Sequence, residues 1–165
     1  MTDVVCEQLI RRRNRSIDLI YRALICFAII ALVFSTVILG TIGLILAVVL
    51  GFAAYYLIFP RFSVEYEYTL INKELDIDII YGKENRKSGM NLDLSQAELI
   101  APLSSPRMAY YQDCKKNNFS ANDPEKPPYA IVMTHKQETV CVLIQMDDTL
   151  YSHLRMAVPR VIYRD

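Results

Sequence analysis

The chain has 165 residues, of which 53% are hydrophobic, and its 18 basic and 18 acidic side chains give a formal net charge of zero. Proteins that bind nucleic acids need clustered positive charge, and beyond the first 22 residues the basic side chains form no stripe. We therefore expect no nucleic-acid partner. Outside its long apolar stretch, the chain has room for one small domain only.

Residues 1–22 form a basic segment in which five arginines outnumber three acidic residues. Apolar residues recur among the arginines at approximately helical spacing: Val5, Leu9, Ile10, Ile17 and Ile20. Such a stripe predicts a short helix lying on the inner membrane surface. The alternative is a basic flank that only orients the segment after it, and the pattern does not separate the two.

Residues 23–60 carry no charge and lie between Arg22 and Arg61. As one helix they would extend roughly 57 Å, whereas the hydrocarbon core of a bilayer is about 30 Å thick and takes about 20 residues. We therefore predict two transmembrane helices, near 23–39 and 42–59, with a break between Gly40 and Gly43. Because neither span contains a charged residue, ion or proton transport is not expected.

Small residues recur every four positions in the second span, at Gly43, Ala47 and Gly51. Small side chains let helices approach closely in lipid, so these positions predict a packing seam, either between the two spans or between two copies of the chain. Arginines flank both ends of the hairpin, which places both termini in the cytoplasm of a multi-pass inner (plasma) membrane protein. The four cysteines have no metal-ligand spacing and suit a reducing compartment better than a disulfide framework.

Residues 61–165 have the pattern of a small, mainly-β cytoplasmic domain. Alternating apolar and polar residues predict strands at 62–70, 75–81, 90–95 and 98–101, with a turn at Asn72-Lys73 and a loop over 82–89. Residues 102–128 hold five of the seven prolines and are mostly loop, with 108–112 either a strand or a helical turn. Two β-prone runs at 129–135 and 139–145 precede a helix that Asp147 or Asp148 caps and Pro159 ends.

About seven short antiparallel strands followed by one capping helix is the element order of a PH-like barrel. Residues 61–165 resemble the small PH-like domains that many bacterial membrane proteins carry after two transmembrane helices. Two segments are similar to those of an uncharacterised bacterial family, a domain of unknown function: Val64-Glu65-Tyr66-Glu67-Tyr68 and Ile80-Tyr81-Gly82-Lys83. The resemblance covers nearly the whole chain and implies a fold and a membrane location, without a catalytic motif.

The sequence lacks the glycine-rich phosphate loop and the His-Glu-x-x-His and Gly-x-Ser-x-Gly motifs of common enzyme classes. His135 and Cys141 are the candidate base and nucleophile of a small thiol-dependent enzyme, but a turn histidine and a core thiol explain them better. We therefore expect no enzyme activity, cofactor or metal.

Residues 61–165 contain two candidate binding surfaces. Carboxylates on the outer face of the first three strands form a candidate docking face, which is otherwise a solvated surface: Glu65, Glu67, Asp76, Asp78 and Asp93. Lys83, Arg86 and Lys87 form a candidate contact with anionic lipid. We interpret the chain as a membrane-anchored interaction or scaffold module whose partner is another protein or a second copy, with an anionic-lipid sensor as the alternative.

Overall fold

The computed structural model describes residues 5–13, 16–135 and 138–164. The chain forms two compact units: a helical unit over Asn14–Val64 with Tyr81–Asn85, and a β unit that contains the rest.

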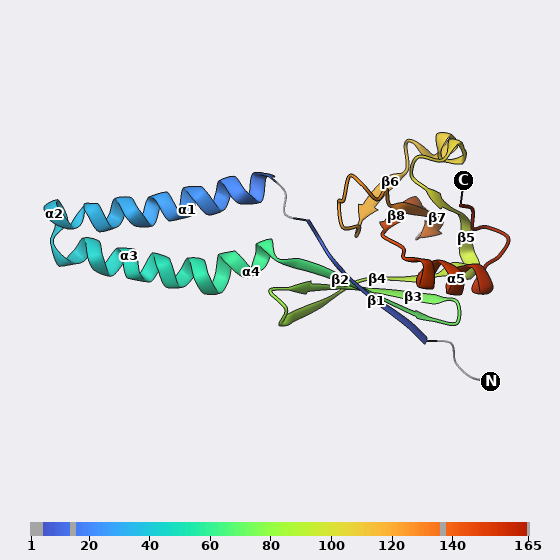
Figure 1. Ribbon diagram of the computed structural model, residues 1–165, viewed down its shortest axis with the longest axis horizontal. Helices are drawn as coiled ribbons and strands as arrows, with labels where there is room; N and C mark the ends of the chain where they lie inside the picture. The colour runs from blue at the N-terminus through green and yellow to red at the C-terminus, as the bar shows by residue number, and fades with distance from the viewer. Residues whose placement is uncertain (1–4, 14–15, 136–137, 165) are drawn as a thin grey trace. The chain divides into compact units, whose positions relative to one another are not determined.

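The helical unit is an antiparallel pair of helices (Figure 1). Its elements are α1 (Ser16–Phe34), α2 (Thr36–Leu39), α3 (Thr41–Ala53), the π-helical turn η1 (Ala54–Ile58) and α4 (Phe59–Phe62). The chain reverses at Gly40, whose φ of +60° is strained for residues with a side chain. A Cβ on Gly43 would lie 3.0 Å from Ser35 Oγ, so the absence of a side chain allows the helices to approach closely here.

The β unit contains two four-stranded sheets. The first has the order β1-β2-β3-β4, from β1 (Val5–Arg11), β2 (Val64–Ile71), β3 (Glu74–Tyr81) and β4 (Asn85–Asp93). The second has the order β5-β7-β8-β6, from β5 (Ala97–Pro102), β6 (Lys115–Asn118), β7 (Tyr129–His135) and β8 (Glu138–Ile144). Two 3₁₀ turns, η2 (Leu94–Gln96) and η3 (Pro106–Tyr111), and the helix α5 (Asp148–Ala157) complete the unit.

The closed antiparallel barrel predicted from the sequence is wrong. The strands form two separate sheets, and β6 runs parallel to β8. β6 was not predicted from the sequence because its residues, Lys115-Lys116-Asn117-Asn118, have no apolar alternation. The predicted loop over 82–89 is too long, since β4 already begins at Asn85, and the 108–112 segment takes the helical alternative as part of η3.

The surface helix considered for the N-terminal segment is wrong for Val5–Arg11, which forms the strand β1. It pairs antiparallel with β2 in a register from Val5 opposite Ile71 to Arg11 opposite Glu65. Cys6 is buried while Val5, Glu7, Leu9 and Arg11 are exposed, which is the alternation of an edge strand. The helical unit is thus inserted in the chain between two neighbouring strands of one sheet.

The core of the β unit lies between the inner faces of the two sheets and α5. Tyr68 is fully buried there and joins the sheets, because its hydroxyl donates to Phe119 O (2.7 Å) and accepts from Gln145 N (3.2 Å). The predicted helix cap is confirmed, since Asp147 Oδ1 accepts a hydrogen bond from Leu150 N at 2.7 Å. After α5, Val161 and Tyr163 hydrogen-bond to both main-chain groups of Ile100 and so cover the outer edge of β5.

A disulfide joins Cys114 to Cys141, with their Cα atoms 5.9 Å apart. The expectation that the cysteines form no disulfide is therefore wrong for this pair. The two residues are 27 positions apart in the chain, and only the parallel pairing of β6 with β8 brings them together. Cys6 and Cys26 are free.

Candidate functional site

The outer face of the first sheet carries four of the five predicted docking carboxylates, and an arginine side chain lies among them. Arg86, at the start of β4, forms ion pairs with Glu67 on β2 and with Asp78 on β3, where Nε lies 3.6 Å from Oδ2. Arg11 is the cross-strand neighbour of Glu65 in the β1–β2 register. The face is therefore acidic but partly neutralised by the chain's own arginines.

The remaining two carboxylates have different local partners. Asp76 accepts a hydrogen bond of 2.5 Å from Asn91 Nδ2 on β4 and stays on the sheet face. Asp93 instead caps η2, where its Oδ1 accepts from both the main chain and the hydroxyl of Ser95. Hydrogen bonds from Ser95 and Gln96 hold the pKa of Asp93 below its ordinary value. Asp93 is thus a capping residue rather than part of the docking face.

The three residues predicted to contact lipid have different surroundings. Arg86 is held by the two carboxylates on the sheet face, and Lys87 is exposed on β4. Lys83 lies in the β3–β4 turn and lines an open cavity of about 420 Å³ together with aromatic residues from the end of the helical pair: Tyr55, Tyr56 and Phe59. These aromatic residues were not predicted as site residues from the sequence, although tyrosines near the end of an apolar span are a recognised sign of a membrane interface.

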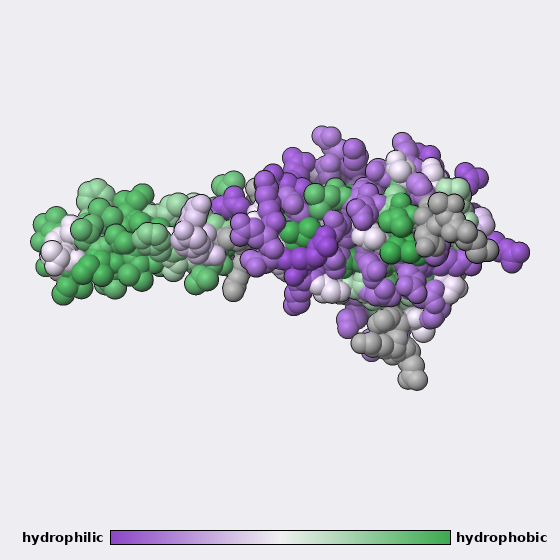
Figure 2. Space-filling view, turned by 90° about the horizontal axis from the view of Figure 1, so that it is seen from below, coloured by the Kyte–Doolittle hydropathy of each residue, from purple (hydrophilic) through white to green (hydrophobic). Residues whose placement is uncertain are grey.

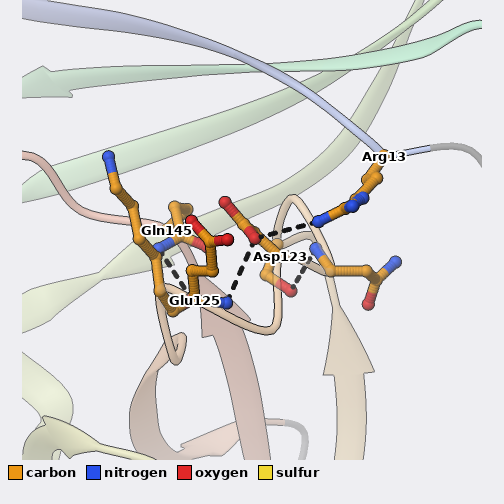
Figure 3. A network of polar contacts seen from close by, with 7 residues as sticks. Arg13, Asp123, Glu125 and Gln145 are labelled. Carbon is orange, nitrogen blue, oxygen red and sulfur yellow. Dashed lines mark hydrogen bonds and ion pairs between the residues drawn. The ribbon is translucent and has the colours of Figure 1, made fainter.

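A polar network holds the segment after β1 in place (Figure 3). Arg13 N donates to Ala121 O at 2.8 Å, and its side chain lies 3.4 Å from Asp123 Oδ1. Asp123 Oδ1 also accepts from Glu125 N (3.1 Å). This network ties the chain just before α1 to the proline-containing loop before β7.

Two helical stretches, Ser16–Ile38 and Thr41–Ile58, are long and apolar enough to cross a membrane. Most of their large apolar side chains are exposed, and hydrophobic residues cover this part of the molecule in Figure 2. Of the predicted seam, Gly43 and Ala47 are buried, whereas a Cβ on Gly51 would meet no atom within 4 Å. The contact between the helices therefore uses the first two positions and leaves the third open.

The candidate enzyme residues have no arrangement for nucleophilic catalysis in the described part of the chain. Cys141 is fully buried and disulfide-bonded, so it offers no thiolate. The side chain of His135 lies outside the described residues. Among the described residues, no three His, Cys, Asp or Glu side chains are placed to hold a metal ion.

A family model described as a bacterial PH-like domain (DUF6106) matches residues 2–164. The chain belongs to this family. The resemblance noted in the sequence is thereby confirmed, and the match includes β1 and the apolar helices as well as the strands after them. No curated protein and no solved structure matches the chain.

Proposed function

We propose that the chain is a membrane-anchored, non-enzymatic interaction module that presents its PH-like domain at the inner leaflet. The observation that carries this proposal is the pairing of β1 with β2 over seven residues, on either side of the apolar helical pair. Two strands of one sheet must lie on the same side of a membrane. The segment between them therefore crosses an even number of times, as a hairpin of two helices does.

The exposed surface of the helices supports the anchoring role. The exposed fractions of Phe34, Val37 and Ile38 are 74%, 89% and 88%. Soluble proteins rarely expose continuous apolar surface on this scale, whereas lipid covers it at no cost. Removal of the first helix as a signal peptide would also remove β1 and leave β2 as an unpaired edge.

The arginines on both sides of the hairpin support a cytoplasmic domain. The Cys114–Cys141 disulfide is more typical of an oxidising compartment. The orientation is tested by Ser88→Cys, an exposed position on β4, in a background in which all four native cysteines are replaced by serine. A membrane-impermeant maleimide should label it only after the cells are opened, and labelling of intact cells would reverse the proposed orientation.

The outer face of the first sheet is the surface that we assign to the partner. Glu67, Asp76 and Asp78 remain partly exposed, so a basic segment of another protein or of a second copy would find carboxylates there. Arg86 sets the geometry of the face and lowers its charge, which argues against a bound metal ion. Isolated ion pairs at such exposure contribute roughly 1 kcal/mol or less to stability. The carboxylates can therefore exchange Arg86 for a cation of a binding partner.

The test is crosslinking in intact membranes followed by affinity purification of the full chain. Glu67, Asp76 and Asp78 are changed together to Ser, and a matched control changes the exposed residues Asp113, Glu125 and Glu138, which lie elsewhere. We expect a crosslinked partner that the first variant loses and the control keeps. An identical crosslink pattern in all three proteins would contradict the docking face.

A further inference from the structure

The open cavity in the helical unit has an unusual combination of walls. One wall is aromatic and comes from the end of the second apolar helix, while the other is polar and comes from the β3–β4 turn. The described residues that line it include Tyr55, Tyr56, Phe59, Lys83, Glu84 and Asn85. Its volume of about 420 Å³ is in the range of pockets that hold small molecules.

The polar wall is a tight turn fixed to the end of the helices. Gly82 and Lys83 both have positive φ angles, of 60° and 69°, and Glu84 N donates to Tyr81 O at 3.3 Å. These angles and this hydrogen bond define a hairpin turn with two left-handed central residues. Gly82 N also donates to Ser63 O at 2.9 Å, which ties the turn to the chain just after α4. Lys83 and Glu84 are thereby held beside the helix end.

The aromatic wall lies where the helix departs from α geometry. Tyr55 and Tyr56 belong to the π-helical turn η1, a geometry that occurs frequently at functional sites. Tyr56 stacks on Phe52 with ring centroids 6.3 Å apart, and Tyr55 meets Tyr56 edge to face at 5.0 Å. The two tyrosines remain 65% and 66% exposed, so ring surface is left for a ligand.

The charges on the cavity indicate the chemistry of the ligand. Among the described lining residues, Lys83 supplies the positive charge and the adjacent Glu84 supplies the negative charge. A purely anionic ligand would be attracted by one and repelled by the other. A ligand with a phosphate and an ammonium group a few atoms apart would match both, and aromatic ring faces attract ammonium groups.

We propose that this cavity binds the zwitterionic headgroup of a membrane phospholipid, such as a phosphoethanolamine. The phosphate lies on Lys83, the ammonium group lies between Glu84 and the tyrosine rings, and the acyl chains follow the apolar side chains of α3. This assignment rests on the membrane anchoring proposed above. A soluble phosphoethanolamine offers the same phosphate and ammonium groups but has no acyl chains to follow α3, whereas a lipid at the end of a membrane span is already positioned at the cavity.

The test uses the full chain, purified in mixed micelles with equal amounts of phosphatidylethanolamine and phosphatidylglycerol that have the same acyl chains. Native mass spectrometry then counts the lipids that remain bound. We expect the native chain to retain the ethanolamine lipid preferentially. Lys83→Gln and Glu84→Gln should each reduce this retention roughly five-fold, as the loss of one exposed charge contact allows.

Two control variants carry the same chemical changes outside the cavity. Lys115→Gln and Glu125→Gln alter exposed residues that do not line it, and both should retain lipid like the native chain. Equal retention of the two lipids, or equal losses in cavity and control variants, would overturn the headgroup site alone. If alkaline carbonate extracts the native chain from cell membranes, the anchoring proposal fails and the headgroup site fails with it.

Discussion

The helical unit and the β unit are specified by sequence signals of different range. In the helical unit, the apolar stretch, its glycine break and its flanking arginines all lie within one continuous segment, and they identify the two helices directly. In the β unit, the first strand lies before the helices and its partner lies after them. One unit is therefore organised by local composition and the other by contacts between segments that are distant in the chain.

If the two units are specified independently, the β unit should fold without the helical unit. Replacing residues 12–64 by Asn-Gly would join Arg11 to Glu65, which are already paired, through a two-residue hairpin turn. We expect the shortened chain to leave the membrane fraction completely and to remain soluble, with a β-sheet circular dichroism spectrum. The measurement is ultracentrifugation of cell lysates without detergent, with the full chain as the reference.

Loss of the Arg13–Ala121 hydrogen bond and of Val64 should lower the stability of this variant, but it should leave the sheets formed. A shortened chain that still pellets with membranes would mean that the β unit carries its own membrane-binding surface. A chain that stays soluble but unfolded would mean that β1 and β2 pair only when the helices hold their ends.

The disulfide is the next largest effect, because it constrains only the β unit. Closing a loop of 27 residues should stabilise the folded domain by about 3–4 kcal/mol in the chain-entropy model. We expect reduction, or Cys114→Ser, to lower the free energy of unfolding in urea by this amount. Cys26→Ser in the helical unit is the control and should change it little.

The redox state of the same cysteine pair also tests on which side of the membrane the β domain lies. Thioredoxin and glutathione keep cytoplasmic thiols reduced. A domain on the cytoplasmic side should therefore carry Cys114 and Cys141 mainly as thiols when cells are quenched in acid and the thiols are labelled after denaturation. Complete oxidation in cells would place the domain on the other side of the membrane.

The Tyr68 hydroxyl tests the contact between the two sheets. Tyr68→Phe leaves Phe119 O and Gln145 N without their buried partner, which should cost about 1–3 kcal/mol of stability. Burial raises the pKa of Tyr68 above its ordinary value of 10.0 in the folded state. The stability that the neutral, buried Tyr68 hydroxyl contributes is fully present below about pH 10 and is lost as pH rises further. Urea titrations from pH 8 to 11 should therefore show that the free energy of unfolding falls at alkaline pH, and that it falls less in Tyr68→Phe.

These contacts explain which parts of the structure the sequence could predict. The strands at 64–71, 74–81, 129–135 and 138–144 and the cap at Asp147 follow from alternation and capping rules that act over a few residues. Neither β1 nor the disulfide could be derived in this way, because each needs a partner from a distant segment. The same holds for the cavity, whose aromatic wall and charged turn meet only after the chain folds.

The smallest expected effect distinguishes the two interpretations of the small-residue seam. Gly43→Ala places a methyl group 3.0 Å from Ser35 Oγ and 3.2 Å from Thr36 N, so it should destabilise the helical pair by about 1 kcal/mol. Gly51→Ala enters open space and should be neutral or slightly stabilising within one chain. Thermal unfolding in detergent compares them. If Gly51→Ala instead lowers the fraction of crosslinked dimer in membranes, that position contacts a second copy, and the seam continues from the hairpin into a dimer.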